Sequence, residues 1–187
     1  MTQRTDTKGL RGKEKADHIW TYYKPQIFLA LLLVFIAGSV VRHLVTRKEI
    51  VLYIGIVNIA ASEELMEEIR TDFLAYACPE EKRTDIEILN ALYLKEDPSA
   101  EETDYVRASE VKFLGSVTAG KMDAVIADAA GMALLKQGEW IEEETVTPVR
   151  SAAFTAHGIT DEIFYATIVT STRKETARQF IASLTNE

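Results

Sequence analysis

The apolar run at residues 26–41 is the feature that most constrains this chain. It reads QIFLALLLVFIAGSVV and lies, uncharged, between Lys24 and Arg42. At about 1.5 Å per residue, a helix of this length approaches the roughly 30 Å hydrocarbon core of a bilayer. A buried core helix is the alternative, but such helices are rarely apolar on every face, and residues 27–36 contain no polar side chain. The sequence therefore predicts one transmembrane helix over residues 25–45.

The residues around this run predict its orientation. Trp20, Tyr22 and Tyr23 precede it, and such rings favour the headgroup level of a membrane. Residues 1–24 contain six Lys or Arg, whereas only three follow closely after the run. Because positive residues stay on the cytoplasmic side, we expect a basic cytoplasmic tail over residues 1–24 and an extracytoplasmic domain over residues 49–187 of a single-pass bacterial membrane protein.

A cleaved signal peptide is the alternative to an uncleaved anchor. The tripeptide at residues 37–39, AGS, loosely resembles the small-residue site that signal peptidases cut. The region before the apolar run is longer than in typical signal peptides, which favours an anchor that stays attached.

Charge divides the chain into two parts. Residues 1–48 carry nine Lys or Arg and three Asp or Glu, a net charge of +6, whereas residues 49–187 carry twelve and twenty-six, a net charge of −14. An acidic domain repels phosphate backbones, so we expect no nucleic-acid partner. The basic segment suits anionic lipid headgroups, so the membrane is the expected partner.

From residue 49 onward, apolar runs and amphipathic segments alternate, which is typical of an α/β fold. We expect a three-layer sandwich with a mainly parallel sheet, preceded by the one transmembrane helix. The predicted strands span 50–60, 85–94, 122–127 and 163–170, with a short strand near 150–154 in an otherwise irregular stretch. The predicted helices span 63–77, about 100–119, 129–137 and 172–184.

Specific residues mark the ends of the predicted helices. Ser62 is the expected cap of the first helix, and the pairs Ser99–Glu102 and Thr172–Glu175 have the spacing of capping boxes. Gly138 is expected to end the third helix in a left-handed conformation. Apolar spacing predicts that Phe113, Leu114 and Val117 all face inward.

Polar and small residues follow the first and third predicted strands. Asn58, Ala61 and Ser62 follow the first, and Asp128 and Ala129 follow the third. The carboxyl ends of parallel strands form the edge at which α/β proteins bind ligands, and helix N-termini there offer free amides. Asp128 and Ser62 are also well suited to be helix caps, and a cap and a ligand contact are compatible roles.

The residues that common chemistries need are missing. The loop NIAASEE contains no glycine, so it cannot form a dinucleotide fingerprint or a phosphate-binding loop. His157 is the one histidine after residue 48, and Cys78 is the single cysteine of the chain. We therefore expect no metal site, no cofactor and no enzymatic activity.

Two segments resemble a known family. GKMDAVIAD followed by KQGEWIEEE, and IFYATIVTSTRKETARQFIASL, are similar to segments of type II periplasmic-binding proteins, the extracellular solute-binding family. Together with the first strand and helix, the resemblance covers most of residues 50–184. It implies that the ligand contacts are Asn58, Ala61, Ser62, Asp128 and Ala129.

This chain departs from the family in size. Family members have two lobes around a cleft, but only 24 residues separate Gly138 from Ile163, where the second lobe would be inserted. The resemblance implies a single lobe on a membrane anchor that binds a small-molecule solute or assists a transporter permease or another envelope protein. The alternative is a structural or protein-interaction module of the cell envelope without a ligand.

Overall fold

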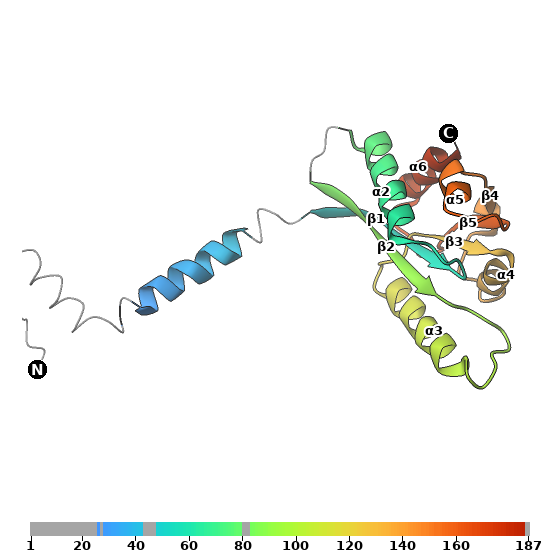
Figure 1. Cartoon of the computed structure of the whole chain (residues 1–187), viewed down its shortest axis with the longest axis horizontal. Helices are drawn as coiled ribbons and strands as arrows, with labels where there is room; N and C mark the ends of the chain where they lie inside the picture. Colours follow the sequence, from blue (N-terminus) through green and yellow to red (C-terminus); the bar gives the residue numbers. More distant parts are fainter. Residues whose placement is uncertain (1–25, 27, 43–47, 80–82, 186–187) are drawn as a thin grey trace, which may run out of the picture. The chain divides into compact units, whose positions relative to one another are not determined.

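The structure, a computed structural model, describes residues 26, 28–42, 48–79 and 83–185 (Figure 1). The chain divides into two units, residues 1–47 and residues 48–187. In the first unit, residues 28–42 are helical, and their large apolar side chains are exposed, Phe28 by 74% and Phe35 by 75%. No helix within the described residues has both the length and the hydropathy that crossing a bilayer requires. The predicted span at 25–45 includes residues 25, 27 and 43–45, which lie outside the described residues, as does the predicted tail at 1–24.

The second unit is an α/β fold built on one five-stranded mixed sheet. The sheet has the order β2-β1-β3-β5-β4, formed by β1 (Glu49–Val57), β2 (Thr84–Leu92), β3 (Ala124–Asp128), β4 (Thr147–Val149) and β5 (Ile163–Thr167). β1 pairs in parallel with β2 and β3, whereas β5 is antiparallel to both β3 and β4. The expectation of a mainly parallel sheet therefore holds for the β2-β1-β3 half alone. Antiparallel neighbours need no helical crossover, and only a short helix joins β4 to β5.

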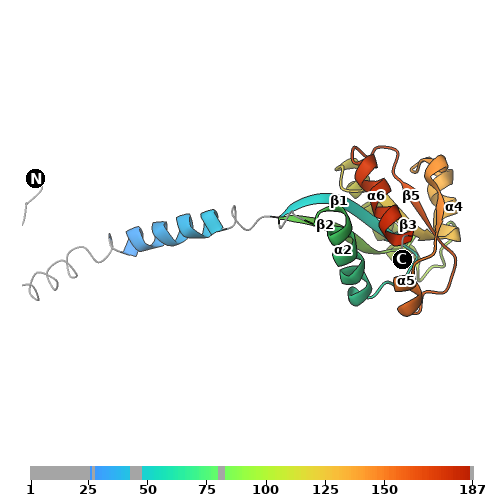
Figure 2. The same ribbon diagram turned by 90° about the horizontal axis from the view of Figure 1, so that it is seen from above.

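Helices flank both faces of the sheet (Figures 1 and 2). One face carries α2 (Glu63–Ala77), α5 (Ala152–Ala156) and α6 (Lys174–Thr185), and the other carries α3 (Thr103–Thr118) and α4 (Ala129–Gln137). A short 3-10 helix, η1 (Glu143–Thr145), precedes β4. Each face has its own apolar cluster, because side chains along a strand alternate between the two sides.

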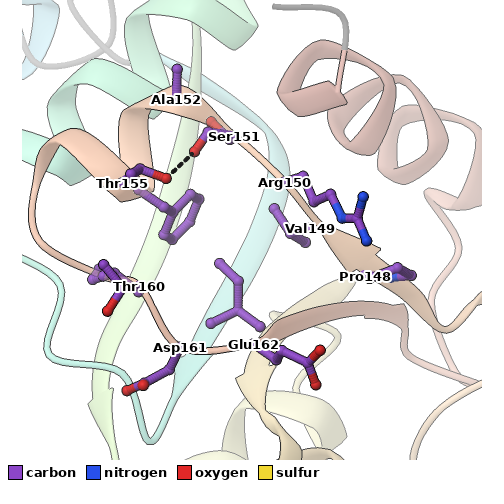
Figure 3. Close-up of a pocket in the computed structure, with 12 residues that line it drawn as sticks. Pro148, Val149, Arg150, Ser151, Ala152, Thr155, Thr160, Asp161 and Glu162 are labelled. Atoms are coloured by element: carbon purple, nitrogen blue, oxygen red, sulfur yellow. Dashed lines mark hydrogen bonds between the residues drawn. The ribbon is translucent and has the colours of Figure 1, made fainter.

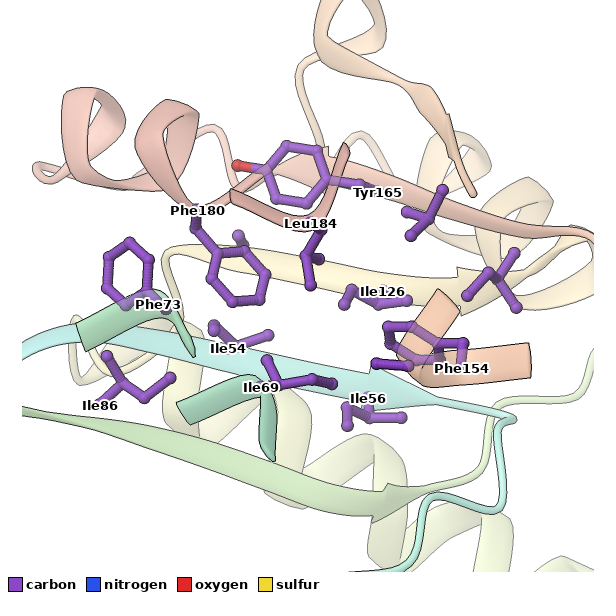
Figure 4. Packing of buried hydrophobic residues seen from close by; sticks show 14 of the residues in the cluster. Ile54, Ile56, Ile69, Phe73, Ile86, Ile126, Phe154, Tyr165, Phe180 and Leu184 are labelled. Carbon is purple, nitrogen blue, oxygen red and sulfur yellow. The ribbon is translucent and has the colours of Figure 1, made fainter. Parts of the chain in front are cut away.

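Aromatic rings fill much of the core beneath α2 and α6 (Figure 4). The rings of Phe73 and Phe180 pack edge to face with centroids 5.4 Å apart, and Tyr165 lies beside Phe180 at 6.4 Å. β1 contributes Ile54 and Ile56 to the same cluster, each only 1% exposed. This burial, worth about 25 cal/mol per Å² of apolar surface, fixes α2 and α6 over the sheet.

A buried carboxylate joins three segments at the amino end of β3. Asp123 is 1% exposed and accepts hydrogen bonds from the Tyr53 amide at 3.0 Å and from Ser171 Oγ at 2.8 Å. Arg173 Nη1 lies 3.2 Å from Asp123 Oδ2, and its guanidinium stacks over the Tyr53 ring at 5.1 Å. A buried charge needs such partners, and here they connect β1, β3 and the loop before α6.

The predicted strand at 150–154 is wrong. The strand ends at Val149, and residues 152–156 form the helix α5. Ser151 separates the two elements, because its Oγ accepts a hydrogen bond from the Ala153 amide at 3.2 Å and so caps the helix.

The predicted left-handed end of α4 is also wrong in its residue. Gly138 has φ −80°, and the following residue, Glu139, adopts the left-handed conformation with φ 56°. A Cβ on Gly138 would lie 2.4 Å from two atoms of the Trp140 ring. Glycine is therefore required here by the close approach of Trp140 and not by its backbone angle.

Both predicted capping boxes begin their helices differently. The amide and Oγ of Ser99 both donate to Glu102 Oε2, at 3.0 and 2.9 Å, and α3 starts only at Thr103. Before α6, Ser171 Oγ accepts from the Arg173 amide at 3.0 Å, and the helix begins two residues later than predicted. On α3, Phe113 and Val117 are buried as predicted, but Leu114 is 39% exposed.

Candidate functional site

The carboxyl ends of β2, β1 and β3 form the candidate site. After β1, helix α2 connects to β2 on one side of β1. Helix α3 then connects β2 to β3, which lies on the other side of β1. The strand order thus reverses between β1 and β3. In open α/β sheets, ligands bind in the crevice outside the carboxyl ends of the strands at such a reversal.

Two of the predicted site residues meet at this position. Asn58, directly after β1, donates from Nδ2 to Asp128 Oδ1 at 3.1 Å and to the Leu94 carbonyl at 3.0 Å. Its Oδ1 accepts from the Leu94 amide at 2.8 Å. Asn58 itself has φ 58°, a left-handed conformation that asparagine tolerates better than most residues. Its side chain therefore joins the ends of β1 and β3 to the segment after β2.

Asp128 is the N-cap of α4 as well as the partner of Asn58. Its Oδ1 accepts from the Gly131 amide at 2.7 Å, as the prediction of a cap requires. A Cβ at Gly131 would lie 3.0 Å from this oxygen and 3.1 Å from Asn58 Nδ2. Glycine in the first turn of α4 thus leaves room for the Asn58–Asp128 pair.

Ser62 is the cap of α2, as predicted, and it has a second partner. Its Oγ accepts from the Leu65 amide at 3.2 Å and lies 3.3 Å from His157 Nδ1. His157 Nε2 lies 2.8 Å from Glu68 Oε2. These three side chains tie α5 to α2. Because the Ser62 oxygen already accepts the capping amide, the arrangement is explained by helix capping and docking.

The two remaining predicted residues are alanines. Ala61 lies on the loop between β1 and α2, and its carbonyl accepts from Asn90 Nδ2 at 2.9 Å. Ala129 is the first residue of α4 and is exposed beside Asp128. All five predicted residues therefore lie at the carboxyl edge of the sheet, but the direct side-chain contact is between Asn58 and Asp128.

Asn58 lines two cavities at this edge of the sheet. The first, called the apolar cavity, measures about 530 Å³, and no charged residue lines it; its lining is Asn58, Ile59, Ala60, Ala61, Ser62, Asn90, Ala91, Leu92, Tyr93 and Tyr105. The second, called the charged cavity, measures about 390 Å³ and is lined by Asn58, Tyr93, Leu94, Lys95, Glu96, Asp128, Ala130, Ala133, Leu134 and Gln137. Asn58 and Tyr93 line both cavities.

β2 and the segment after it also contribute residues to the site, and these were not predicted from the sequence. Ala91 has φ 58°, and the pairing of β1 with β2 shifts register there, which is a β-bulge. Tyr105 of α3 donates to the Ala91 carbonyl at 3.3 Å, and Lys112 Nζ lies 3.1 Å from the Asn90 carbonyl. The asparagine within an apolar strand pattern is the one sequence signal of this bulge.

An ion pair holds the loop after β2. Lys95 Nζ lies 2.7 Å from Glu102 Oε2. The hydrogen bond from Lys95, together with those from Ser99, lowers the pKa of Glu102 to about 2. The same partner raises the pKa of Lys95. The charge of Lys95, which lines the charged cavity, is therefore balanced by a partner within the protein.

A third hollow, of about 480 Å³, lies between β4, α5 and the start of β5 (Figure 3). Arg150, Asp161 and Glu162 lie around it, and Thr155 Oγ1 donates to the Ser151 carbonyl at 3.3 Å. This hollow lies beside the antiparallel part of the sheet, where Ile163 lines it and pairs with Asp128 across β3 and β5. It contains none of the predicted site residues.

No group of three His, Cys, Asp or Glu side chains with metal-binding geometry occurs in the described ranges. Cys78 is the C-cap of α2 and is half-buried.

Comparisons with protein-family models, with curated proteins and with solved structures gave no match to this chain. The resemblance to type II periplasmic-binding proteins therefore stays a prediction.

Proposed function

We propose that this protein is a membrane-anchored, extracytoplasmic, non-catalytic domain that binds a small solute at the carboxyl edge of its sheet. The observation that carries the proposal is the contact between Asn58 and Asp128 at the reversal of the strand order, where Asn58 lines two cavities and Asp128 lines one of them. Each cavity is within the size range of small-molecule sites. The resemblance to a single lobe of a type II periplasmic-binding protein is consistent with this placement.

A screen of solutes by thermal shift tests the proposal. The full chain, purified in a mild detergent, is heated with sugars, amino acids, amines and organic acids. Binding to the folded state raises the melting temperature with solute concentration. We expect at least one solute to bind at the edge that Asn58 and Asp128 occupy. A screen without any stabilising solute would contradict the proposal.

The exposed apolar helix supports the anchoring part. Large side chains on all its sides are uncovered, including Phe28, Leu29, Leu33 and Val34. A contiguous apolar surface of this kind marks a membrane or protein contact. With the basic residues before it, the helix is proposed as the described part of a transmembrane segment. We expect the protein in the membrane fraction, resistant to carbonate, with residues after 48 cleaved by protease added to spheroplasts. A soluble or protected domain would contradict this assignment.

A second candidate function is a docking module for a transporter permease or another envelope protein. A groove of about 290 Å³ between α3 and α4 has an apolar floor that includes Phe113, Leu114, Leu134 and Trp140, and its lining also contains the charged residues Lys95, Glu96 and Glu110. Leu114, which lines this groove, is 39% exposed. Crosslinking from position 114 in intact cells separates the candidates, because a docking module yields a specific protein adduct there whether or not a solute binds.

A further inference from the structure

We infer that the carboxyl-edge site binds a small organic cation, an ammonium group carried on an apolar or aromatic body. This inference rests on the proposed function, since it specifies the ligand class of the same site. The two cavities differ in chemistry and have Asn58 and Tyr93 in common, so they are neighbours at the same edge, and we infer that the ammonium group lies in the charged one and the apolar body toward the other.

The charged cavity favours a positive group. Among its lining residues, Lys95 is the one cation, and Glu102 neutralises it at 2.7 Å. The other two charged residues of the lining are the carboxylates of Asp128 and Glu96, so the lining has a net negative charge. The two hydrogen bonds that the described residues make to Asp128 both use Oδ1, which leaves Oδ2 as an acceptor. A cationic donor is the natural partner of a half-buried carboxylate.

Anions are disfavoured at the same edge. The N-terminus of α4 would attract an anion, but the carboxylate of Asp128 already occupies it. The first turn of α2 contains Glu63 and Glu64, which repel a second negative charge. A carboxylate or phosphate ligand would therefore meet like charges at both helix ends.

The apolar cavity suits the body of such a ligand. Its lining carries no charge and includes the rings of Tyr93 and Tyr105, whose centroids lie 6.0 Å apart. Aromatic rings contact apolar groups well, and their faces attract cations. Tyr93 lies at the boundary between the two cavities, where the ammonium group would join the apolar body.

Three matched probes test the ligand class by calorimetry and thermal shift on the full chain in detergent. They are 2-phenylethylamine, 2-phenylethanol and 3-phenylpropanoate, which share a phenyl group and a short linker but differ in charge. We expect the amine to bind about tenfold or more tightly than the alcohol, the acid not to bind measurably, and added salt to weaken amine binding.

Variants assign the effect to the residues named. Asp128→Asn keeps a capping oxygen and removes the carboxylate nearest the proposed ammonium group, so we expect most of the preference for the amine over the alcohol to be lost even though Glu96 is still present. Tyr93→Leu should weaken both ligands by similar factors. Glu144→Gln, which removes an exposed carboxylate that lines neither cavity, is the matched control and should bind as the parent does.

Several results would overturn the inference. It is wrong if the acid or the alcohol binds as tightly as the amine, if Asp128→Asn retains the preference for the amine, or if none of the three probes binds. The wider solute screen then distinguishes the two proposals. If another solute binds and depends on Asn58 or Tyr93, only the ligand class fails. If no solute binds at all, the proposed function fails with it.

Discussion

Asp128 combines two roles in one carboxylate, and its substitutions separate them. Asn at position 128 retains an oxygen for the Gly131 amide, so we expect Asp128→Asn to change the free energy of unfolding little. Asp128→Ala removes the cap and the partner of Asn58, and we expect a loss of about 1–2 kcal/mol. Urea unfolding of both variants measures this difference. An equal loss for both would show that the charge, and not the capping oxygen, stabilises the fold.

Tyr165 gives the domain a dependence on alkaline pH. Burial raises the pKa of Tyr165 to about 12, from an ordinary value of 10.0. The stability that its buried neutral form contributes is fully present below pH 10.0 and is lost as the pH rises to about 12. Its hydroxyl also donates to the Ala177 carbonyl at 2.7 Å. We expect Tyr165→Phe to cost about 1–2 kcal/mol at neutral pH.

Measuring the stability of the parent and of Tyr165→Phe across pH isolates the contribution of Tyr165. Because phenylalanine does not titrate, we expect the stability gap between parent and Tyr165→Phe to shrink as the pH rises from 10.0 to about 12. Chemical denaturation at a series of alkaline pH values measures the gap. A gap that stays constant would mean that the hydroxyl titrates alike in the folded and unfolded chain.

At the scale of elements, the end of α4 depends on the absence of a side chain at Gly138. A Cβ there would overlap the Trp140 ring, which itself packs edge to face on Phe113 at 6.0 Å. We expect Gly138→Ala to destabilise the domain by about 1–3 kcal/mol through displacement of this ring. Tryptophan fluorescence and thermal unfolding measure the effect. Gly115→Ala, on the exposed side of α3 where a Cβ meets nothing within 4 Å, is the control.

The bulge in β2 stores backbone strain beside the apolar cavity. Ala91 is left-handed, which costs a residue with a Cβ about 1–2 kcal/mol. We expect Ala91→Gly to stabilise the domain by about 0.5–1 kcal/mol, because relief of this strain is partly offset by the freedom that glycine gains in the unfolded chain. Thermal unfolding of this variant gives the sign. A loss of stability would indicate that the alanine methyl group makes a packing contribution larger than the strain.

Elements with strong local signals were predictable from the sequence. The acidic first turn, the Ser62 cap and the regular apolar spacing predicted α2, and Asp128 with the small residues after it predicted α4 with its observed bounds. Other features depend on distant contacts. The close approach of Trp140 decides why position 138 is glycine. The antiparallel direction of β5 is set by its pairing with β3 and β4, which no local sequence pattern indicates.

The candidate site follows the same division. The chain order places Asn58 and Asp128 after strands, so their position at one edge was predictable. Their hydrogen bond joins the ends of β1 and β3, which are 70 residues apart in the sequence. The bulge at Ala91 and the wall formed by Tyr93 and Tyr105 arise from the folded arrangement of β2 and α3.

For the whole molecule, we predict that residues 48–187 fold alone. The two apolar clusters lie within this unit, and Lys48 pairs with Asp85 at its start. The fragment should be soluble and unfold in one cooperative transition, because all exposed apolar residues of the helix at 28–42 are removed. Calorimetry and circular dichroism with a mixed helix and strand spectrum check this. Aggregation, or a spectrum of helix alone, would contradict it.

The buried Asp123 cluster lies at the end of β3 opposite to Asp128. Within the described residues, the groups that lock β1, β3 and the start of α6 together are thus separate from the groups that line the cavities. Mutations at the cavity edge can accumulate without dissolving this lock. The architecture can therefore persist while the lining of the cavities changes during evolution or by design.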